Sequence, residues 1–294
     1  MSEAPAKPSK LVSPAWIQAR PRGDFLLFEV GFGESDKYRA SHIPGAVYLD
    51  TNALERPPLW NRIPDDELER VLLAYGITAL GTTHDKTVVL YARGSTAGAR
   101  AAVILLYAGV RDVRLLDGGY PAWERCERAG FPCEMGENCP TPANRFGERF
   151  PARPEFFVST EEVRGLLADA KSVVVSVRSW AEYIGETSGY DFILPKGRIA
   201  GAVWGHAGSD KDRMEHYRNP DGTARSLDEI AANWRKRGIT PDQRVVFYCG
   251  TGWRASEAFF YAYAMGWEKI SVYDGGWLEW SSDPANPIEV GVPE

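Results

Sequence analysis

The chain has 294 residues, which is long for a single hydrophobic core, so we expect two domains of ordinary size. Hydrophobic residues make up 44% and charged residues 25%, a balance that is typical of folded globular proteins and not of disordered ones. The net charge of −6 argues against nucleic acid or an anionic membrane as the main partner. No apolar run has the length of a membrane span.

The first ten residues are polar and proline-rich and lack the apolar segment of a secretory signal. A cytoplasmic protein is therefore expected, or a periplasmic one if a signal has been removed. Four cysteines are too few for a disulfide framework. Cys126, Cys133 and Cys139 lie close together, but without the histidine or the spacing of a zinc site. We expect them to be incidental to function, with a local disulfide as the alternative.

In chain order, the first half begins with Leu11–Ile17, which combines the end of a strand, a serine N-cap and the start of a helix. Residues 25–30 form a short apolar run that is suited to a buried parallel strand. The motif Ile43-Pro-Gly-Ala46 follows, and a helical stretch then ends at Gly76, where glycine fits a helix C-cap. A second apolar strand is expected over residues 87–91.

The second half repeats this order. Residues 157–163 correspond to the first segment, with Ser159 and Glu162 in the pattern of a capping box. Ile199-Ala-Gly-Ala202 matches the earlier motif. The strand at 244–248 and the segment 270–280, with its Asp-Gly-Gly sequence, align with 87–91 and 113–123 without a gap. So many ordered matches indicate a duplication.

A proline-rich segment, residues 139–155, separates the halves and is predicted to be a linker. Strands that alternate with helices in each half predict an α/β fold, with two tandem domains that each contain a parallel sheet flanked by helices. We therefore expect one domain over residues 10–138 and a second over residues 156–294. Features that occur in both copies are candidates for folding, and features in one copy are candidates for chemistry.

The loop after the last matched strand differs between the copies. The first copy has Ala92 at this point and the second has Cys249, and a helix follows in each, over 98–107 and 255–264. Backbone N–H groups of such a loop, together with a helix N-terminus, favour a thiolate over a thiol. No histidine near Cys249 in the sequence is available as a general base. Cys249 is therefore the candidate nucleophile, and the loop that would bind its sulfur consists of Gly250, Thr251, Gly252, Trp253 and Arg254.

Each loop residue has an expected part. The two glycines permit backbone torsions that turn amides inward, and Thr251 can add a hydroxyl donor. Trp253 is expected to cover one wall of the pocket. Arg254 is expected either to point toward an anionic donor or to support the loop.

The pattern Cys-x4-Arg between a strand and a helix, with Tyr273-Asp-Gly-Gly-Trp277 after it and Ile199-Ala-Gly-Ala202 before it, resembles the rhodanese family of thiosulfate and mercaptopyruvate sulfurtransferases. The sequence from Cys249 to Ser256, together with residues 205–210, is similar to a bacterial multi-domain subgroup of that family. The resemblance covers nearly the whole chain and implies an inactive first domain, an active second domain and a site at the domain interface.

The resemblance also implies the reaction. Cys249 would take the outer sulfur of thiosulfate, or of 3-mercaptopyruvate as the alternative, and hold it as a persulfide. A thiophilic acceptor such as cyanide, a thiol or thioredoxin would then remove the sulfur. No metal or organic cofactor is expected, and neither is a nucleic acid or membrane partner. We expect a monomer.

The donor is the part of this resemblance that the sequence supports least. Mercaptopyruvate enzymes have an arginine before an aromatic residue, where this chain has Glu182-Tyr183, and a carboxylate there is expected to repel an anionic donor. Arg178 and His206 are possible substrate contacts, although a structural role is favoured for both. Asp274 and its counterpart Asp117 are interpreted as turn or cap residues, because both copies contain them. Trp277 and Trp280 are assigned to the core.

Two other functions remain open. A cysteine phosphatase has a Cys-x5-Arg loop, and the loop here is one residue shorter, which suits a sulfur atom better than a phosphoryl group. A dedicated protein-to-protein persulfide carrier would use the same cysteine without a small-molecule donor.

Overall fold

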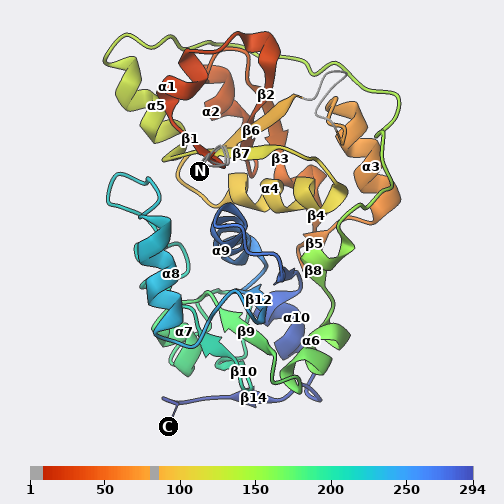
Figure 1. The fold of residues 1–294 in the computed structure, drawn as a ribbon, viewed down its shortest axis with the longest axis vertical. Helices are drawn as coiled ribbons and strands as arrows, with labels where there is room; N and C mark the ends of the chain where they lie inside the picture. The colour runs from red at the N-terminus through yellow and green to blue at the C-terminus, as the bar shows by residue number, and fades with distance from the viewer. Residues whose placement is uncertain (1–8, 80–85, 294) are drawn as a thin grey trace, which may run out of the picture.

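The computed structural model describes residues 9–79 and 86–293. It contains two α/β halves stacked along the longest axis of the molecule, with helices α4 and α9 between them (Figure 1). No described helix is both long and apolar enough to cross a membrane. The N-terminal residues in which no signal was expected lie mostly outside the described part of the chain.

The N-terminal half is built on a five-stranded parallel sheet with the order β1-β7-β6-β2-β3. Its strands are β1 (Leu11–Val12), β2 (Phe25–Gly31), β3 (Val47–Asp50), β6 (Thr87–Tyr91) and β7 (Val113–Leu116), and its helices are α1 (Pro14–Gln18), α2 (Ser35–Ala40), α3 (Asp65–Ala74), α4 (Ala97–Ala108) and α5 (Gly119–Glu127). A short antiparallel hairpin, β4 (Glu55–Arg56) and β5 (Asn61–Arg62), projects from this half toward the other one (Figure 1).

The C-terminal half has a second five-stranded parallel sheet, in the order β11-β9-β12-β13-β8. Its strands are β8 (Phe157–Val158), β9 (Ser172–Ser176), β11 (Val203–Trp204), β12 (Arg244–Tyr248) and β13 (Ile270–Tyr273), and its helices are α6 (Thr160–Leu167), α7 (Trp180–Ile184), α8 (Leu227–Arg235), α9 (Trp253–Ala264) and α10 (Gly276–Ser282). A separate antiparallel pair joins β10 (Arg198–Ile199) to β14 (Ile288–Glu289). The α/β fold with two tandem parallel sheets is therefore confirmed.

Local sequence explains most of these elements. The central strands β6 and β12 are apolar and buried, as expected for strands that are covered on both faces. Ser159 and Glu162 form the predicted capping box at the start of α6. Helix α9 begins at Trp253, two residues earlier than predicted, so that Arg254 lies in its first turn and not in the loop.

The two halves meet through α4 and α9, whose side chains are almost entirely buried. Both helices are rich in alanine, which allows them to pack closely. A buried ion-pair cluster supports this contact: Arg100 on α4 binds Glu55 of its own half at 2.8 Å and Asp274 of the other half at 2.7 Å. The interface is therefore an apolar core with charged groups that bridge it.

Asp117 and Asp274 have equivalent roles in this interface. Each carboxylate accepts a hydrogen bond from a backbone N–H of the opposite half, Asp117 from Ala224 at 2.7 Å and Asp274 from Arg62 at 2.9 Å. These aspartates were predicted to be local turn or cap residues. The structure shows that they join the two halves, which a comparison of the copies within one chain could not reveal.

Candidate active site

Cys249 lies directly after β12, the central strand of the C-terminal sheet, at the edge where ligands commonly bind in open α/β sheets. The loop between β12 and α9 is Cys249–Gly252. Gly252 has a φ of 88°, in the left-handed region that favours glycine, and immediately precedes the helix. The chain therefore turns sharply from the strand into α9, and Cys249 stands at that turn.

The Asp-Gly-Gly-Trp motif supports this loop from beneath. The backbone N–H of Trp277 donates to the carbonyl of Cys249 at 2.8 Å, and that of Leu278 donates to the carbonyl of Gly250 at 3.0 Å. Gly276 has a φ of 55°, and a Cβ added to it would lie 2.6 Å from the Gly250 oxygen. The motif thus requires glycine so that α10 can approach the cysteine loop. Trp277 and Trp280 are fully buried, as predicted.

The first copy retains the same support around Ala92. The N–H of Tyr120 donates to the carbonyl of Ala92 at 2.9 Å, and Gly119, with a φ of 59°, makes the equivalent close approach. Ala92 and Cys249 are therefore structurally equivalent positions. A cavity of about 340 Å³ lies beside Ala92, at the interface between the halves.

Several backbone N–H groups of the cysteine loop and of the first turn of α9 have no recorded acceptor among the described residues. Within the described residues, no acceptor is recorded for the N–H groups of Gly250, Thr251, Trp253, Arg254 and Ala255. These groups follow Cys249 closely and include the first turn of α9, where the helix dipole favours negative charge. The arrangement can accommodate an anion next to the cysteine.

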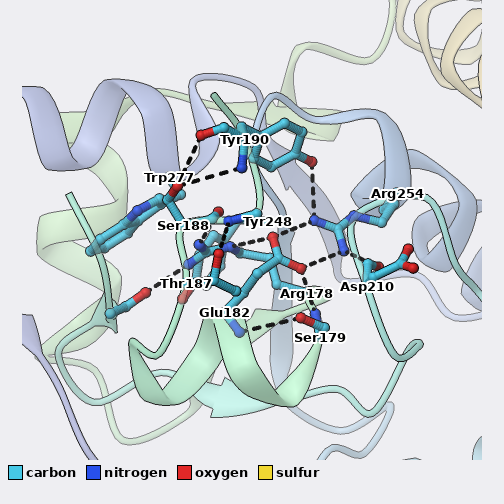
Figure 2. A network of polar contacts seen from close by, with 12 residues as sticks. Arg178, Ser179, Glu182, Thr187, Ser188, Tyr190, Asp210, Tyr248, Arg254 and Trp277 are labelled. Carbon is cyan, nitrogen blue, oxygen red and sulfur yellow. Dashed lines mark hydrogen bonds and ion pairs between the residues drawn. The ribbon is translucent and has the colours of Figure 1, made fainter. Parts of the chain in front are cut away.

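Arg254 is held by a carboxylate and does not point into open solvent. Its two terminal nitrogens bind the two oxygens of Glu182 at 2.9 and 2.8 Å, and both side chains are buried (Figure 2). It also donates to the carbonyl of Asp210 at 3.1 Å. Its Nε is buried and has no hydrogen-bond partner among residues 9–79 and 86–293. None of these contacts is with residues 249–252, so both expectations for Arg254, contact with an anionic donor and support of the loop, stay predictions.

Glu182 is therefore not a free carboxylate that repels donors, and that prediction was wrong. Burial would raise its pKa, but Arg254 and Arg178 outweigh the effect and hold the pKa at about 2. The residue also completes a capping box on α7 with Ser179. Ser179 and Arg178 are near Glu182 in the sequence, but its pairing with Arg254, 72 residues away, is visible only in the structure.

Arg178 is buried and fully engaged. It binds Glu182 at 3.2 Å and donates to the carbonyls of Gly197 and Ser188 at 2.7 and 2.9 Å (Figure 2). The favoured reading of this residue as a structural ion-pair partner agrees with these contacts. Its position leaves no nitrogen for a substrate.

Tyr190 is a site residue that the sequence did not single out. Its hydroxyl accepts a hydrogen bond from Arg254 at 3.0 Å (Figure 2). Its ring lies so close to Gly250 that a Cβ added there would be 2.3 Å from Cε2. Burial raises the pKa of Tyr190 to about 12, so its hydroxyl is protonated at neutral pH. No local pattern marks Tyr190, which lies in an irregular segment between α7 and β10.

The N-terminal half also reaches the cysteine loop. The indole N–H of Trp253 donates to Glu55 at 2.7 Å, and Phe32 makes an edge contact with Trp253. Trp253 therefore fills space between the halves, close to its expected role as a wall of the site. The arrangement places the cysteine loop at the domain interface.

The other candidates lie apart from this cluster. His206 packs on Trp204 and His216 and contacts Arg237 at 3.1 Å, and burial lowers its pKa to about 4. It is therefore neutral at pH 7, and none of its recorded contacts is with the cysteine loop. The three clustered cysteines, Cys126, Cys133 and Cys139, are free, so the alternative of a local disulfide is wrong.

The fold and site define a class of protein: tandem α/β domains in which one strand-loop-helix turn contains a buried cysteine and the equivalent turn does not. Comparison with known proteins agrees with this class. Residues 13–126 and 159–283 each match the rhodanese-like domain. The chain belongs to the rhodanese family. The family and the names of the relatives confirm the expected sulfurtransferase activity.

Several relatives match nearly the whole chain. It is 50% identical to thiosulfate sulfurtransferase YnjE of Escherichia coli, over 99% of this chain and 69% of that protein. The crystal structure of YnjE superimposes with a TM-score of 0.90. The wild-type structure of EanB has 44% identity and a TM-score of 0.89 over 97% of this chain and 70% of that one. The sulfur carrier protein TtuD of Thermus thermophilus is 29% identical over 97% of this chain and 98% of its own length.

Proposed function

We propose that the chain transfers a sulfane sulfur from thiosulfate to a thiophilic acceptor through a persulfide on Cys249. The observation that carries the proposal is the contrast between two equivalent turns. Both have the same glycine motif against the same carbonyl, but only the second has a thiol at the strand end, and it has Arg254 where the first copy has Ala97. The first half would then have no reaction of its own and would support the cysteine loop across the domain interface.

The first step is a displacement at sulfur. The Cys249 thiolate attacks the outer sulfur of thiosulfate, a new S–S bond forms, and sulfite leaves with the electron pair of the old bond. The free N–H groups of the loop would stabilise the negative charge on the bound sulfur. In the second step a thiolate or cyanide attacks the outer sulfur and Cys249 leaves as a thiolate, so no external oxidant or reductant is needed.

The charges of the site support a small anionic donor. Arg178, Arg254 and Glu182 together have a net charge of +1, and the three side chains are buried. Among the described residues, the buried Nε–H of Arg254 has no hydrogen-bond partner, so this guanidinium has unused hydrogen-bonding capacity for an anion. Mercaptopyruvate, whose sulfurtransferase in Escherichia coli is 28% identical over 87% of this chain, is the alternative donor.

A heteroaromatic acceptor is a second candidate for the sulfur. The solved structures of EanB include complexes with hercynine and ergothioneine, a cysteine persulfide, and variants with a tyrosine or a threonine replaced. Tyr190 and Thr251 lie at the same spacings from Cys249 as that tyrosine and threonine lie from the persulfide cysteine of EanB. In this transfer the imidazole carbon would form a bond to the outer sulfur while the S–S bond to Cys249 breaks. The proton that the carbon loses would pass to the Cys249 thiolate.

Mass spectrometry of the intact protein tests the proposal. After incubation with thiosulfate, we expect the protein to gain the mass of one sulfur atom on the peptide that contains Cys249. Cys249→Ser should abolish this gain, while Cys139→Ser, which removes an exposed thiol, should not. A persulfide on another cysteine would contradict the proposal. If only a persulfidated protein, and no small donor, loads Cys249, the carrier function is correct.

A further inference from the structure

Cys249 has no exposed surface, although a donor must contact its sulfur. Cys249 belongs to an apolar core cluster that includes side chains of both halves. A nucleophile that is sealed in this way cannot react until some covering group moves. The question is therefore which group covers the loop and what holds it there.

Tyr190 has the position of such a cover. Its ring lies directly against Gly250, the residue after Cys249, with Cε2 at 2.3 Å and the hydroxyl oxygen at 2.7 Å from the place that a Cβ would occupy. Gly250 must be glycine for the ring to lie there. The tyrosine thus closes the loop from the side of the α7–β10 segment.

One hydrogen bond from a charged group fixes the ring. Arg254 Nη2 donates to the Tyr190 hydroxyl at 3.0 Å, while Glu182 holds the same guanidinium in place through both terminal nitrogens (Figure 2). The other recorded hydrogen bonds of Tyr190 are local: its backbone contacts the Ser188 hydroxyl at 2.9 and 3.4 Å, and its carbonyl accepts from the N–H of Ile193 at 3.4 Å. The segment belongs to no strand, and the bond from Arg178 to the Ser188 carbonyl at 2.9 Å holds its backbone but not the ring of Tyr190.

The neighbourhood of Tyr190 allows the ring to move outward. Gly189 has a φ of 82°, and the side chains of Phe192 and Leu194 are 56% and 83% exposed. The ring of Phe192 lies 5.4 Å from that of Tyr190. The segment therefore has a glycine in the left-handed region on one side of Tyr190 and exposed side chains on the other.

We propose that Tyr190 is a gate over Cys249, and that an anionic donor opens it by taking the hydroxyl's place on Arg254 Nη2. The inference rests on the proposed function for the identity of the donor. The hydrogen bond from Arg254 Nη2 to the Tyr190 hydroxyl, which we call the latch, uses the same N–H that the anion would use. Closure of the gate and binding of the donor therefore exclude each other. Tyr190 would then select donors that have an anionic end, because a neutral molecule cannot compete for the guanidinium.

The accessibility of Cys249 tests the gate without any turnover. The rate of alkylation by iodoacetamide is measured on the peptide that contains Cys249, because Cys126, Cys133 and Cys139 also react. Tyr190→Phe removes the latch and keeps the ring, and should raise the rate about tenfold, the effect of one hydrogen bond to a charged group. Tyr190→Ala removes the ring and should raise it further. Tyr183→Phe is the matched control, since it removes a buried hydroxyl that donates to Ala202 at 2.7 Å.

Inorganic sulfate tests the anion's part. At constant ionic strength it should speed alkylation of the wild type and have little effect on Tyr190→Phe, whose latch is already absent. An equal effect on both proteins overturns the anion-opened latch. If Tyr190→Ala melts like the wild type and alkylates at the wild-type rate, Tyr190 is not a gate.

The two proposals can fail separately. If the wild type forms no persulfide with thiosulfate but the alkylation rates change as expected, the proposed donor is wrong and the gate stands. If persulfide forms on Cys249 and the alkylation rates do not respond to Tyr190, the proposed function stands and the gate is wrong.

Discussion

Glu182 is the residue on which the charge balance of the site depends. Its carboxylate lies between two buried guanidinium groups, at 2.8 Å from Arg254 and 3.2 Å from Arg178. A buried arginine without a counter-ion is strongly unfavourable, so one glutamate keeps both in place. The remaining positive charge is available to a thiolate or a bound anion.

Replacement of Glu182 by glutamine should therefore lower the free energy of unfolding by about 3 kcal/mol at neutral pH. The folded-state pKa of about 2 lies below that of an unfolded glutamate, about 4.3, so the stabilisation is complete above pH ~4.3 and lost as the pH falls toward 2. Urea unfolding of both proteins at several pH values measures this, and the difference between them should shrink in acid. Glu161→Gln, which changes an exposed ion pair, is the control, and a difference that does not depend on pH would refute the assignment.

The strand-loop-helix turn is the element that both halves share, and the glycine after Asp-Gly in each half is what lets it form. Gly276 and Gly119 both have a positive φ. Each lies so close to a carbonyl oxygen of the turn that an added Cβ would clash with it. Folding accounts for the glycine in both copies. The proposed chemistry depends on it in the second copy alone.

Gly276→Ala and Gly119→Ala separate these two roles. Each should destabilise the protein by about 1–2 kcal/mol or more, because alanine is strained at positive φ and its Cβ meets a carbonyl oxygen. Only Gly276→Ala should slow persulfide formation on Cys249, since it alone displaces that loop. Thermal unfolding and intact-mass kinetics on both variants provide the test. An equal loss of persulfide formation in both would show that the effect is general destabilisation.

At the scale of the whole molecule, the interface makes one unit of the two halves. Helices α4 and α9 pack across it, and Arg100, which is fully buried, connects Glu55 of its own half with Asp274 of the other. The Asp274 that receives Arg100 belongs to the motif beneath Cys249. The first half therefore supports the site even though its own turn contains Ala92.

Arg100→Ala should cost about 3–5 kcal/mol of stability, because it leaves two carboxylates buried and without their common partner. We also expect it to slow persulfide formation, since Asp274 would lose the contact that fixes it. Calorimetry and intact-mass kinetics measure the two effects. Arg70→Ala, which breaks an exposed ion pair with Asp66, should change neither by much. Wild-type stability of Arg100→Ala would show that the interface does not depend on this cluster.

The duplication, the α/β class, the parallel strands and the position of Cys249 after a strand could all be predicted from the amino-acid sequence. Local sequence patterns predict these features, namely short apolar runs, cap residues and motifs that recur in the same order. The contrast between Ala92 and Cys249 is also visible there, because it needs only an alignment of the two halves.

The tertiary structure alone decided which groups meet. Glu182 pairs with Arg254 and not with a substrate, Tyr190 lies on Gly250, and Asp117 and Asp274 reach across the interface. These partners are far apart in the chain, and no periodicity or motif links them. Whether a carboxylate repels a bound anion or stabilises neighbouring cations depends on the charges within a few ångströms of it. Those neighbours are known only from the tertiary structure.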